Sequence, residues 1–171
     1  MTVQNKQNKM AWASMESPIG RLVILADGHG ITEIRFRNNS SPLPTGQDSG
    51  NEWVALAIEQ LNAYFDKRLT KFELPLSLDG TAFQQGVWGE LQNIDYGSTA
   101  SYGQIAAAIN KPKAARAVGM ANNKNRIPII IPCHRVIGSN GALIGFAGGL
   151  DTKRWLLQHE GVCVENNQGH K

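Results

Sequence analysis

The stretch "IIIPCHRVIG", residues 129–138, joins the most apolar run of this chain to three residues that can carry chemistry. Three isoleucines run into Pro132, and Cys133, His134 and Arg135 follow at once. Proline fixes its own φ and favours an extended conformation for the residue before it. We therefore expect an apolar strand whose last residues hold the cysteine in a rigid backbone conformation.

The neighbours of Cys133 favour a reactive thiol, although a cysteine behind an apolar strand is more often a small buried hydrophobe. His134 and Arg135 place polarising or positive groups beside a thiol whose pKa is ordinarily about 8.5. The thiolate is the reactive form, so this setting suits a nucleophile. In an extended segment adjacent side chains point to opposite faces, so that His134 reaches Cys133 only through a bend or a bridging water molecule.

A histidine that acts as a base also needs an acid to orient its ring. The two acids that lie close downstream are Asp151 and Glu160. Asp151 starts a predicted helix that Gly161 ends, and Glu160 lies at the C-terminal end of that helix. The helix macrodipole disfavours a negative charge at this end, which favours a functional reason for Glu160.

Composition and charge indicate a globular protein with a basic second half. The 171 residues make one large domain or two small ones. Residues 1–80 carry 8 Lys and Arg against 9 Asp and Glu, whereas residues 81–160 carry 8 against 4. The excess in the second half favours a polyanionic partner there, and it also lies within the range of an ordinary solvated surface.

No apolar run approaches the about 20 residues that span a membrane. The N-terminal "MTVQNKQNKM" lacks the apolar segment of a secretory signal. We therefore expect a protein of the cytoplasm, or of the nucleus in a eukaryote, whose two cysteines are thiols. The cysteines and histidines show no zinc spacing, so we expect no metal, and we expect no cofactor.

The first half has the pattern of a small sheet with one helix. Turn signals separate short predicted strands at residues 10–17, 21–26 and 31–36. Residues 52–66 place apolar side chains at helical spacing. The segment "FELPLSL", residues 72–78, is predicted to be extended, and its internal Pro75 indicates an edge strand.

The second half is mainly helical. Thr81 followed by Gln84 is a capping-box pattern that opens a helix over residues 81–92. "SYGQIAAAI" begins with the same pattern, "NKPK" then breaks the chain, and "AARAVGMAN" resumes as a helix. Two short helices with a tight connection are compatible with a helix-turn-helix, although most such pairs are plain packing.

The second of these helices has almost no side-chain bulk, because it contains Ala114, Ala115, Ala117 and Ala121. The high helix propensity of alanine explains this without any function. The alternative is that a large partner must come close to the helix backbone.

These residues together resemble the O6-alkylguanine-DNA alkyltransferases. The resemblance rests on "IPCHRVIGSNGALIGFAGGLDTKRWLLQHEG", and its context matches in "FQQGVWGEL", "YGQIA" and "PKAARAVG". It covers about half of the chain with specific motifs, and the first half resembles the family only in layout. It implies an α+β protein, with a small RNase H-like sheet-plus-helix domain over residues 1–78 and a mainly helical domain with a helix-turn-helix over residues 79–171.

The resemblance also implies a reaction. The family repairs DNA by a single, irreversible transfer of an alkyl group from O6-alkylguanine, and also from O4-alkylthymine, to the cysteine that matches Cys133. The helix-turn-helix enters the minor groove, and the damaged base is flipped into the cysteine pocket. His134 would act as a base through water, and Glu160 would orient it. The implied partner is double-stranded DNA with O-alkylated bases, bound by a monomer.

Further roles follow residue by residue from the family. Tyr102 matches the tyrosine that rotates the nucleotide, Asn125 the asparagine that joins the recognition helix to the cysteine strand, and Arg116 the arginine that fills the gap in the base stack. The implied substrate pocket consists of Tyr102, Asn125, Val136, Phe146, Ala147 and Gly148. The implied DNA contacts are Lys113, Ala115, Arg116, Ala117, Asn122 and Arg135.

The pocket departs from the family at Phe146-Ala147, where relatives often have Tyr-Ser, so that two hydroxyl groups are missing.

Three other functions compete with repair. A binding-only relative has tryptophan at the cysteine position, which Cys133 argues against. A transcriptional regulator would read the major groove with long polar side chains, to which an alanine-faced helix is poorly suited. A cysteine hydrolase needs a thiol–imidazole contact that strand geometry resists.

Overall fold

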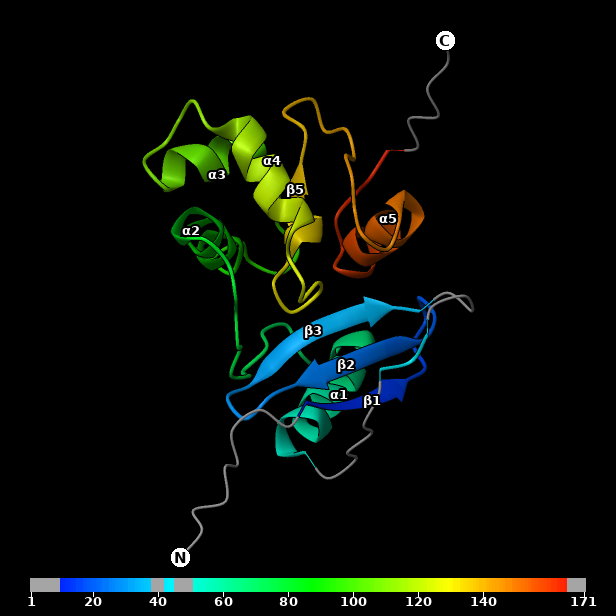
Figure 1. Ribbon diagram of the computed structural model, residues 1–171. Helices are drawn as coiled ribbons and strands as arrows, with labels where there is room; N and C mark the ends of the chain where they lie inside the picture. The colour runs from blue at the N-terminus through cyan, green and yellow to red at the C-terminus, as the bar shows by residue number, and fades with distance from the viewer. Residues whose placement is uncertain (1–9, 38–41, 45–50, 166–171) are drawn as a thin grey trace, which may run out of the picture. The chain divides into compact units, whose positions relative to one another are not determined.

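The computed structural model describes residues 10–37, 42–44 and 51–165 (Figure 1). The chain separates into two compact units, Met1–Leu78 and Asp79–Lys171. The first unit contains a sheet of three strands and one helix, and the second unit consists mainly of helices. The predicted α+β class is therefore confirmed. Among the described residues, no helix combines the length and the hydropathy that a membrane span requires.

A three-stranded antiparallel sheet forms the first unit, with strands in the order in which they occur in the sequence. The strands are β1 Ala11–Met15, β2 Leu22–Ala26 and β3 Ile31–Phe36. All residues of the central strand β2 are buried, because neighbours cover both of its edges and its apolar side chains fill the core. Asp27 closes the β2–β3 hairpin, since its carboxylate accepts hydrogen bonds from the backbone N–H groups of His29 and Gly30.

The helix α1, Glu52–Phe65, lies against one face of this sheet (Figure 1). Asn51 caps it by accepting hydrogen bonds from the backbone N–H groups of Trp53 and Val54. Its apolar stripe is buried and consists of Val54, Ala57, Leu61 and Tyr64.

The proline-containing segment at the end of this unit is not the edge strand that its sequence predicts. Only Leu76 pairs, in an isolated parallel bridge with Ile31. Pro75 has no N–H with which to continue a ladder. The side chain of Gln60 instead satisfies both backbone groups of Glu73, with its amide N–H on the carbonyl and its oxygen on the N–H, both at 2.9 Å.

The second unit is mainly helical, as predicted. Its elements are α2 Ala82–Leu91, α3 Tyr102–Ala108, α4 Ala115–Asn123, α5 Leu150–His159 and a short parallel pair of strands, β4 Ala100–Ser101 and β5 Val136–Ile137. Both predicted capping boxes are present, at Thr81 with Gln84 and at Ser101 with Gln104. Figure 1 shows α2, α3 and α4 packed together, with β5 beside α4.

The pair α3 and α4 is joined by residues 109–114 and packs on α2. Val118 and Ala121 are the apolar side chains that α4 buries. The indole N–H of Trp88 on α2 donates a 2.9 Å hydrogen bond to the carbonyl of Ala121, which anchors α4 on its inner side. The opposite side of α4 therefore remains exposed.

We predict that Gly30→Ala destabilises the first unit. A Cβ on Gly30 would lie 2.3 Å from the carbonyl oxygen of Pro75, where backbone on both sides must move. We expect a loss of about 1–3 kcal/mol in the free energy of unfolding, measured with urea. Gly86→Ala is the control, because nothing lies within 4 Å of its Cβ position in α2; it should stabilise by about 0.5–1 kcal/mol. Equal effects of the two changes would contradict the packing argument.

Candidate active site

The segment before the cysteine bends instead of forming the predicted strand. The side chain of Asn125 accepts a hydrogen bond from the backbone N–H of Ile127 at 2.9 Å and donates one to the carbonyl of Ile131 at 3.0 Å. These are backbone groups that a strand would offer to a neighbour. Between them Ile129 takes a φ of 73°, a strained value for a β-branched residue. Asn125 thus holds a tight turn that leads to the cysteine.

A single 3-10 turn, Cys133–Arg135, carries the three residues that the sequence singled out. The expectation of an extended segment is wrong here, because the backbone bends into a turn at the cysteine. In the turn the side chains of His134 and Arg135 both reach the carboxylate of Glu160, which follows α5 as its C-cap residue.

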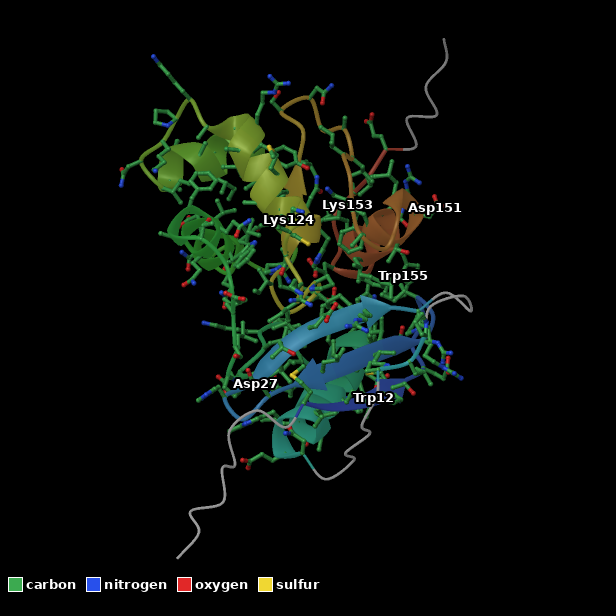
Figure 2. All side chains as sticks on the ribbon, viewed as in Figure 1. Trp12, Asp27, Lys124, Asp151, Lys153 and Trp155 are labelled. Carbon is green, nitrogen blue, oxygen red and sulfur yellow. The ribbon has the colours of Figure 1, made fainter. Side chains whose placement is uncertain are left out.

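The carboxylate of Glu160 is the centre of a buried cluster. The Nε2 of His134 donates to Oε1 at 2.7 Å. The guanidinium of Arg135 donates to both oxygens, from Nε at 2.8 Å and from Nη2 at 3.0 Å. All three residues are buried. The other candidate acid, Asp151, has a fully exposed side chain that pairs with Arg154 instead, and Figure 2 labels it on α5.

Charges in this cluster are opposed by burial and stabilised by hydrogen bonds. Burial raises the pKa of Glu160, but hydrogen bonds from His134 and Arg135 outweigh it and hold the pKa at about 2. Burial lowers the pKa of His134 more than Glu160 raises it, so the imidazole is neutral at neutral pH. Because an ionised carboxylate can only accept, the proton of the neutral ring lies on Nε2 and Nδ1 carries a lone pair. Among the described residues that buried Nδ1 has no hydrogen-bond partner.

Arg135 does not lie where a DNA contact would need it, so that prediction is corrected. It is 6% exposed, and its third nitrogen, Nη1, donates to the carbonyl of Ile94 at 2.7 Å. Its guanidinium also lies over the ring of Tyr96. These bonds hold the buried guanidinium on Glu160, and its burial rather than its pairing keeps it from the surface.

Cys133 is nearly buried, with 5% of its surface exposed. Burial raises the pKa of its thiol, and a hydrogen bond from Asn125 and the charge of Lys153 only partly oppose this. The expectation that Arg135 and His134 would favour a thiolate is therefore wrong, because the first faces Glu160 and the second is neutral. In this state the sulfur carries its proton.

Lys153 is a site residue that the sequence reasoning missed. Although it is fully buried, its Nζ donates to the carbonyls of Val136 at 2.7 Å and Ile144 at 2.8 Å. Burial lowers its pKa to about 8. Figure 2 shows it on the side of α5 that faces the chain around β5. The available signal was its spacing, because Lys153, Leu156, Leu157 and Glu160 recur at the helical period of one buried face.

The loop before α5 brings two more predicted residues to the site. Tyr102 is half-buried, and its hydroxyl donates to the carbonyl of Ile144 at 3.2 Å, the same oxygen that Lys153 binds. Burial and the nearby Cys133 raise the pKa of Tyr102, so its hydroxyl keeps its proton. The ring of Phe146 meets the ring of His134 edge-on, with 6.5 Å between their centres. Ala147 is exposed and Gly148 half-buried in the same loop.

Asn122 also lies elsewhere than the predicted DNA contact. It is 6% exposed, and its amide donates to the carbonyl of Cys133 at 3.3 Å. It therefore links the buried side of α4 to the cysteine turn. Of the other predicted DNA contacts, Lys113, Arg116 and Ala117 are exposed and Ala115 is half-buried.

A nearly buried thiol, a neutral imidazole held by a carboxylate and a helix that exposes Arg116 thus lie in one unit. Within the described ranges no group of three or more His, Cys, Asp and Glu side chains could hold a metal ion. Fold and site define a protein with a nearly buried thiol next to a helix pair, α3 and α4, that is compatible with a helix-turn-helix.

Similarity to known proteins identifies the family of this chain. Residues 10–78 match the ribonuclease-like domain of 6-O-methylguanine DNA methyltransferase, and residues 82–162 match its DNA binding domain. The chain belongs to this family, which confirms both the resemblance and the ribonuclease-like fold expected for the first half.

Individual relatives agree over nearly the whole length. A methylated-DNA–protein-cysteine methyltransferase of Methanosarcina acetivorans is 46% identical over 90% of this chain and 100% of its own. One of Mycobacterium leprae is 49% identical over 86% of this chain and 90% of its own. The crystal structure of Mycobacterium tuberculosis OGT in complex with DNA is similar with a TM-score of 0.81, at 47% identity, over 88% of this chain and 92% of that chain.

We predict that Glu160→Gln destabilises the protein in a pH-dependent way. The folded pKa of about 2 lies below the ordinary 4.5, so ionised Glu160 contributes stability above pH 4.5 that is lost as the pH falls towards 2. The shift corresponds to about 3 kcal/mol. Urea unfolding should show a gap between wild type and variant that is widest at neutral pH and narrows below about pH 4.5. A gap that does not change with pH would refute this account.

We predict that Lys153→Met raises the pKa of Cys133, because the charge of Lys153 lowers it in the wild type. Below about pH 8, where Lys153 is charged, iodoacetamide should label the variant more slowly than the wild type, with Cys163→Ser as the common background because Cys163 is the exposed cysteine. Lys153 loses its charge around pH 8, so the two profiles should converge above that pH. Lys153→Arg, which keeps the charge, is the control. Superimposable profiles would show that the lysine does not act on the thiol.

Proposed function

We propose that the protein repairs DNA by transferring an alkyl group from the O6 of guanine to the sulfur of Cys133, once per molecule. One observation carries the proposal. In a chain of the methyltransferase family, the nearly buried Cys133 shares a turn with His134, whose unprotonated Nδ1 is held available by Glu160. Relatives at 46% and 49% identity are methylated-DNA–protein-cysteine methyltransferases.

The reaction starts from a protonated thiol. As the sulfur of Cys133 attacks the alkyl carbon, its proton passes through a bridging water molecule to Nδ1 of His134. The S–C bond forms, the bond between that carbon and O6 breaks, and guanine leaves with the electron pair. Glu160 supports this step, because an ionised carboxylate stabilises the imidazolium that forms. The product is a thioether, which water does not cleave, so the cysteine is not regenerated.

The leaving guanine needs a proton donor, and Tyr102 fits this role. Its raised pKa keeps the hydroxyl protonated, and the ring is half-buried beside the loop of Ile144. We place the flipped base between Phe146, Ala147 and Gly148 and the cysteine turn, with O4-alkylthymine as a second, smaller substrate. The carbonyl of Val136 binds Lys153 and has a second lone pair for an exocyclic amine.

The partner in this proposal is double-stranded DNA. The related OGT of Mycobacterium tuberculosis was solved with DNA. Ala115 and Ala117 leave α4 thin enough for a minor groove that is about 6 Å wide. Arg116 is exposed on this helix and would fill the gap that a flipped base leaves, while Lys113 contacts phosphate. One unit carries the whole site, so a monomer suffices, acting in the cytoplasm or, in a eukaryote, the nucleus.

Other functions fit the observations less well. A binding-only relative lacks the nucleophile, whereas position 133 is a cysteine. A cysteine hydrolase needs the imidazole on the sulfur, and Nδ1 of His134 has no hydrogen-bond partner among the described residues. A regulator of transcription would not explain the buried cluster around Glu160.

Intact-protein mass measurement tests the proposal. After incubation with duplex DNA that contains O6-methylguanine, the wild type should gain one methyl group, located on Cys133 by peptide mapping, and then stop. Cys133→Ser should gain nothing, and Cys163→Ser, which removes the exposed cysteine, should behave like the wild type. Methylation of Cys163, no transfer, or repeated turnover would each refute the proposal.

A further inference from the structure

Met120 is the most exposed large apolar side chain among the described residues. It is 69% exposed, against 50% for Ile144 and 44% for Leu150. Single exposed apolar residues are common and need no explanation by themselves. This one lies in the middle of α4, a helix whose other exposed positions are small or polar.

Two neighbours define where Met120 lies. Arg116 is one turn earlier on α4, so its side chain and that of Met120 share the exposed face of the helix. Gly119 precedes Met120, and a Cβ there would lie only 3.7 Å from the ring of Tyr102. Met120 points about 100° further round the helix than Gly119, so it lies on the exposed face beside Arg116 and away from the side that faces the tyrosine.

The surroundings of Met120 indicate an anionic partner. Lys113, Arg116 and Lys124 are exposed along α4 and at its ends, and α4 itself contains no acidic residue. Figure 2 shows Lys124 at the C-terminal end of this helix. An apolar side chain among cations matches duplex DNA, whose minor groove presents apolar sugar edges between two rows of phosphates.

We propose that Met120 enters the minor groove as an apolar wedge beside the flipped nucleotide and determines how strongly this chain binds the distorted duplex. Proteins that kink DNA insert Phe, Leu, Ile, Met or Pro in this way. The unbranched thioether of methionine adapts to an irregular surface. Arg116 contributes an electrostatic attraction to DNA at the same face, and salt weakens this attraction. Met120 contributes an apolar contact, which salt does not screen. The inference rests on the proposed function and adds a determinant of DNA binding to it.

Substitution of Met120 tests the wedge. Met120→Ala should lower the rate of alkyl transfer from a methylated duplex about ten-fold, a loss in the range expected for an apolar side chain that is no longer covered. The salt dependence of binding should stay unchanged, because no charge is removed. Met120→Leu, which keeps an apolar side chain of similar volume, should stay close to wild type.

Two controls separate binding from folding and chemistry. Reaction with free O6-benzylguanine needs no duplex, so Met120→Ala should react with it within about two-fold of wild type. Met10→Ala removes an exposed methionine from the other unit and should leave both reactions unchanged. A wild-type rate of Met120→Ala on the duplex would overturn the wedge and leave the proposed function standing. Absence of transfer by the wild type itself would overturn both.

Peroxide footprinting provides a direct readout. Mild oxidation converts exposed methionine to its sulfoxide. Bound duplex should protect Met120 at least several-fold and leave Met10, which is 43% exposed, unaffected. Equal oxidation of Met120 with and without DNA would show that this side chain does not enter the complex.

Discussion

The carboxylate of Glu160 is the interaction on which the active-site region depends. It accepts hydrogen bonds from two consecutive side chains, His134 and Arg135, and all three residues are buried. Removing any one of them would leave a buried charge or donor without its partner, which costs several kcal/mol (about 3–5). The same carboxylate decides the chemistry, because it holds the proton of His134 on Nε2 and leaves Nδ1 as the basic atom.

Polar side chains, rather than a sheet, hold the chain around Cys133. Asn125 binds the backbone at two points before the cysteine, and Lys153 binds it at two points after. This arrangement allows a tight turn at a position that a strand would make straight. It also buries the thiol, and this burial raises the pKa of Cys133 more than the charge of Lys153 lowers it. The sulfur is thus protected until a proton acceptor and a substrate act on it together, which suits a cysteine that reacts once.

Local patterns in the sequence predicted the helices well, because their determinants lie within a few residues of one another. Both capping boxes and the cap at Asn51 formed as expected. The two predicted strands that failed, before the cysteine and around Pro75, failed for one reason. In each case a distant or flanking side chain, Gln60 or Asn125, took the backbone hydrogen bonds that a neighbouring strand would have used.

The sequence by itself determined the family, the α+β class and the identity of the central residues, since the motif around Cys133 and its context are contiguous. Only the tertiary structure decided which charges face one another. In the folded chain Arg135 and Asn122 point inwards, and Lys153 reaches the loop of Tyr102. The pKa of the cysteine depends on these placements, because burial and charge act through distances in space that spacing along the chain does not contain.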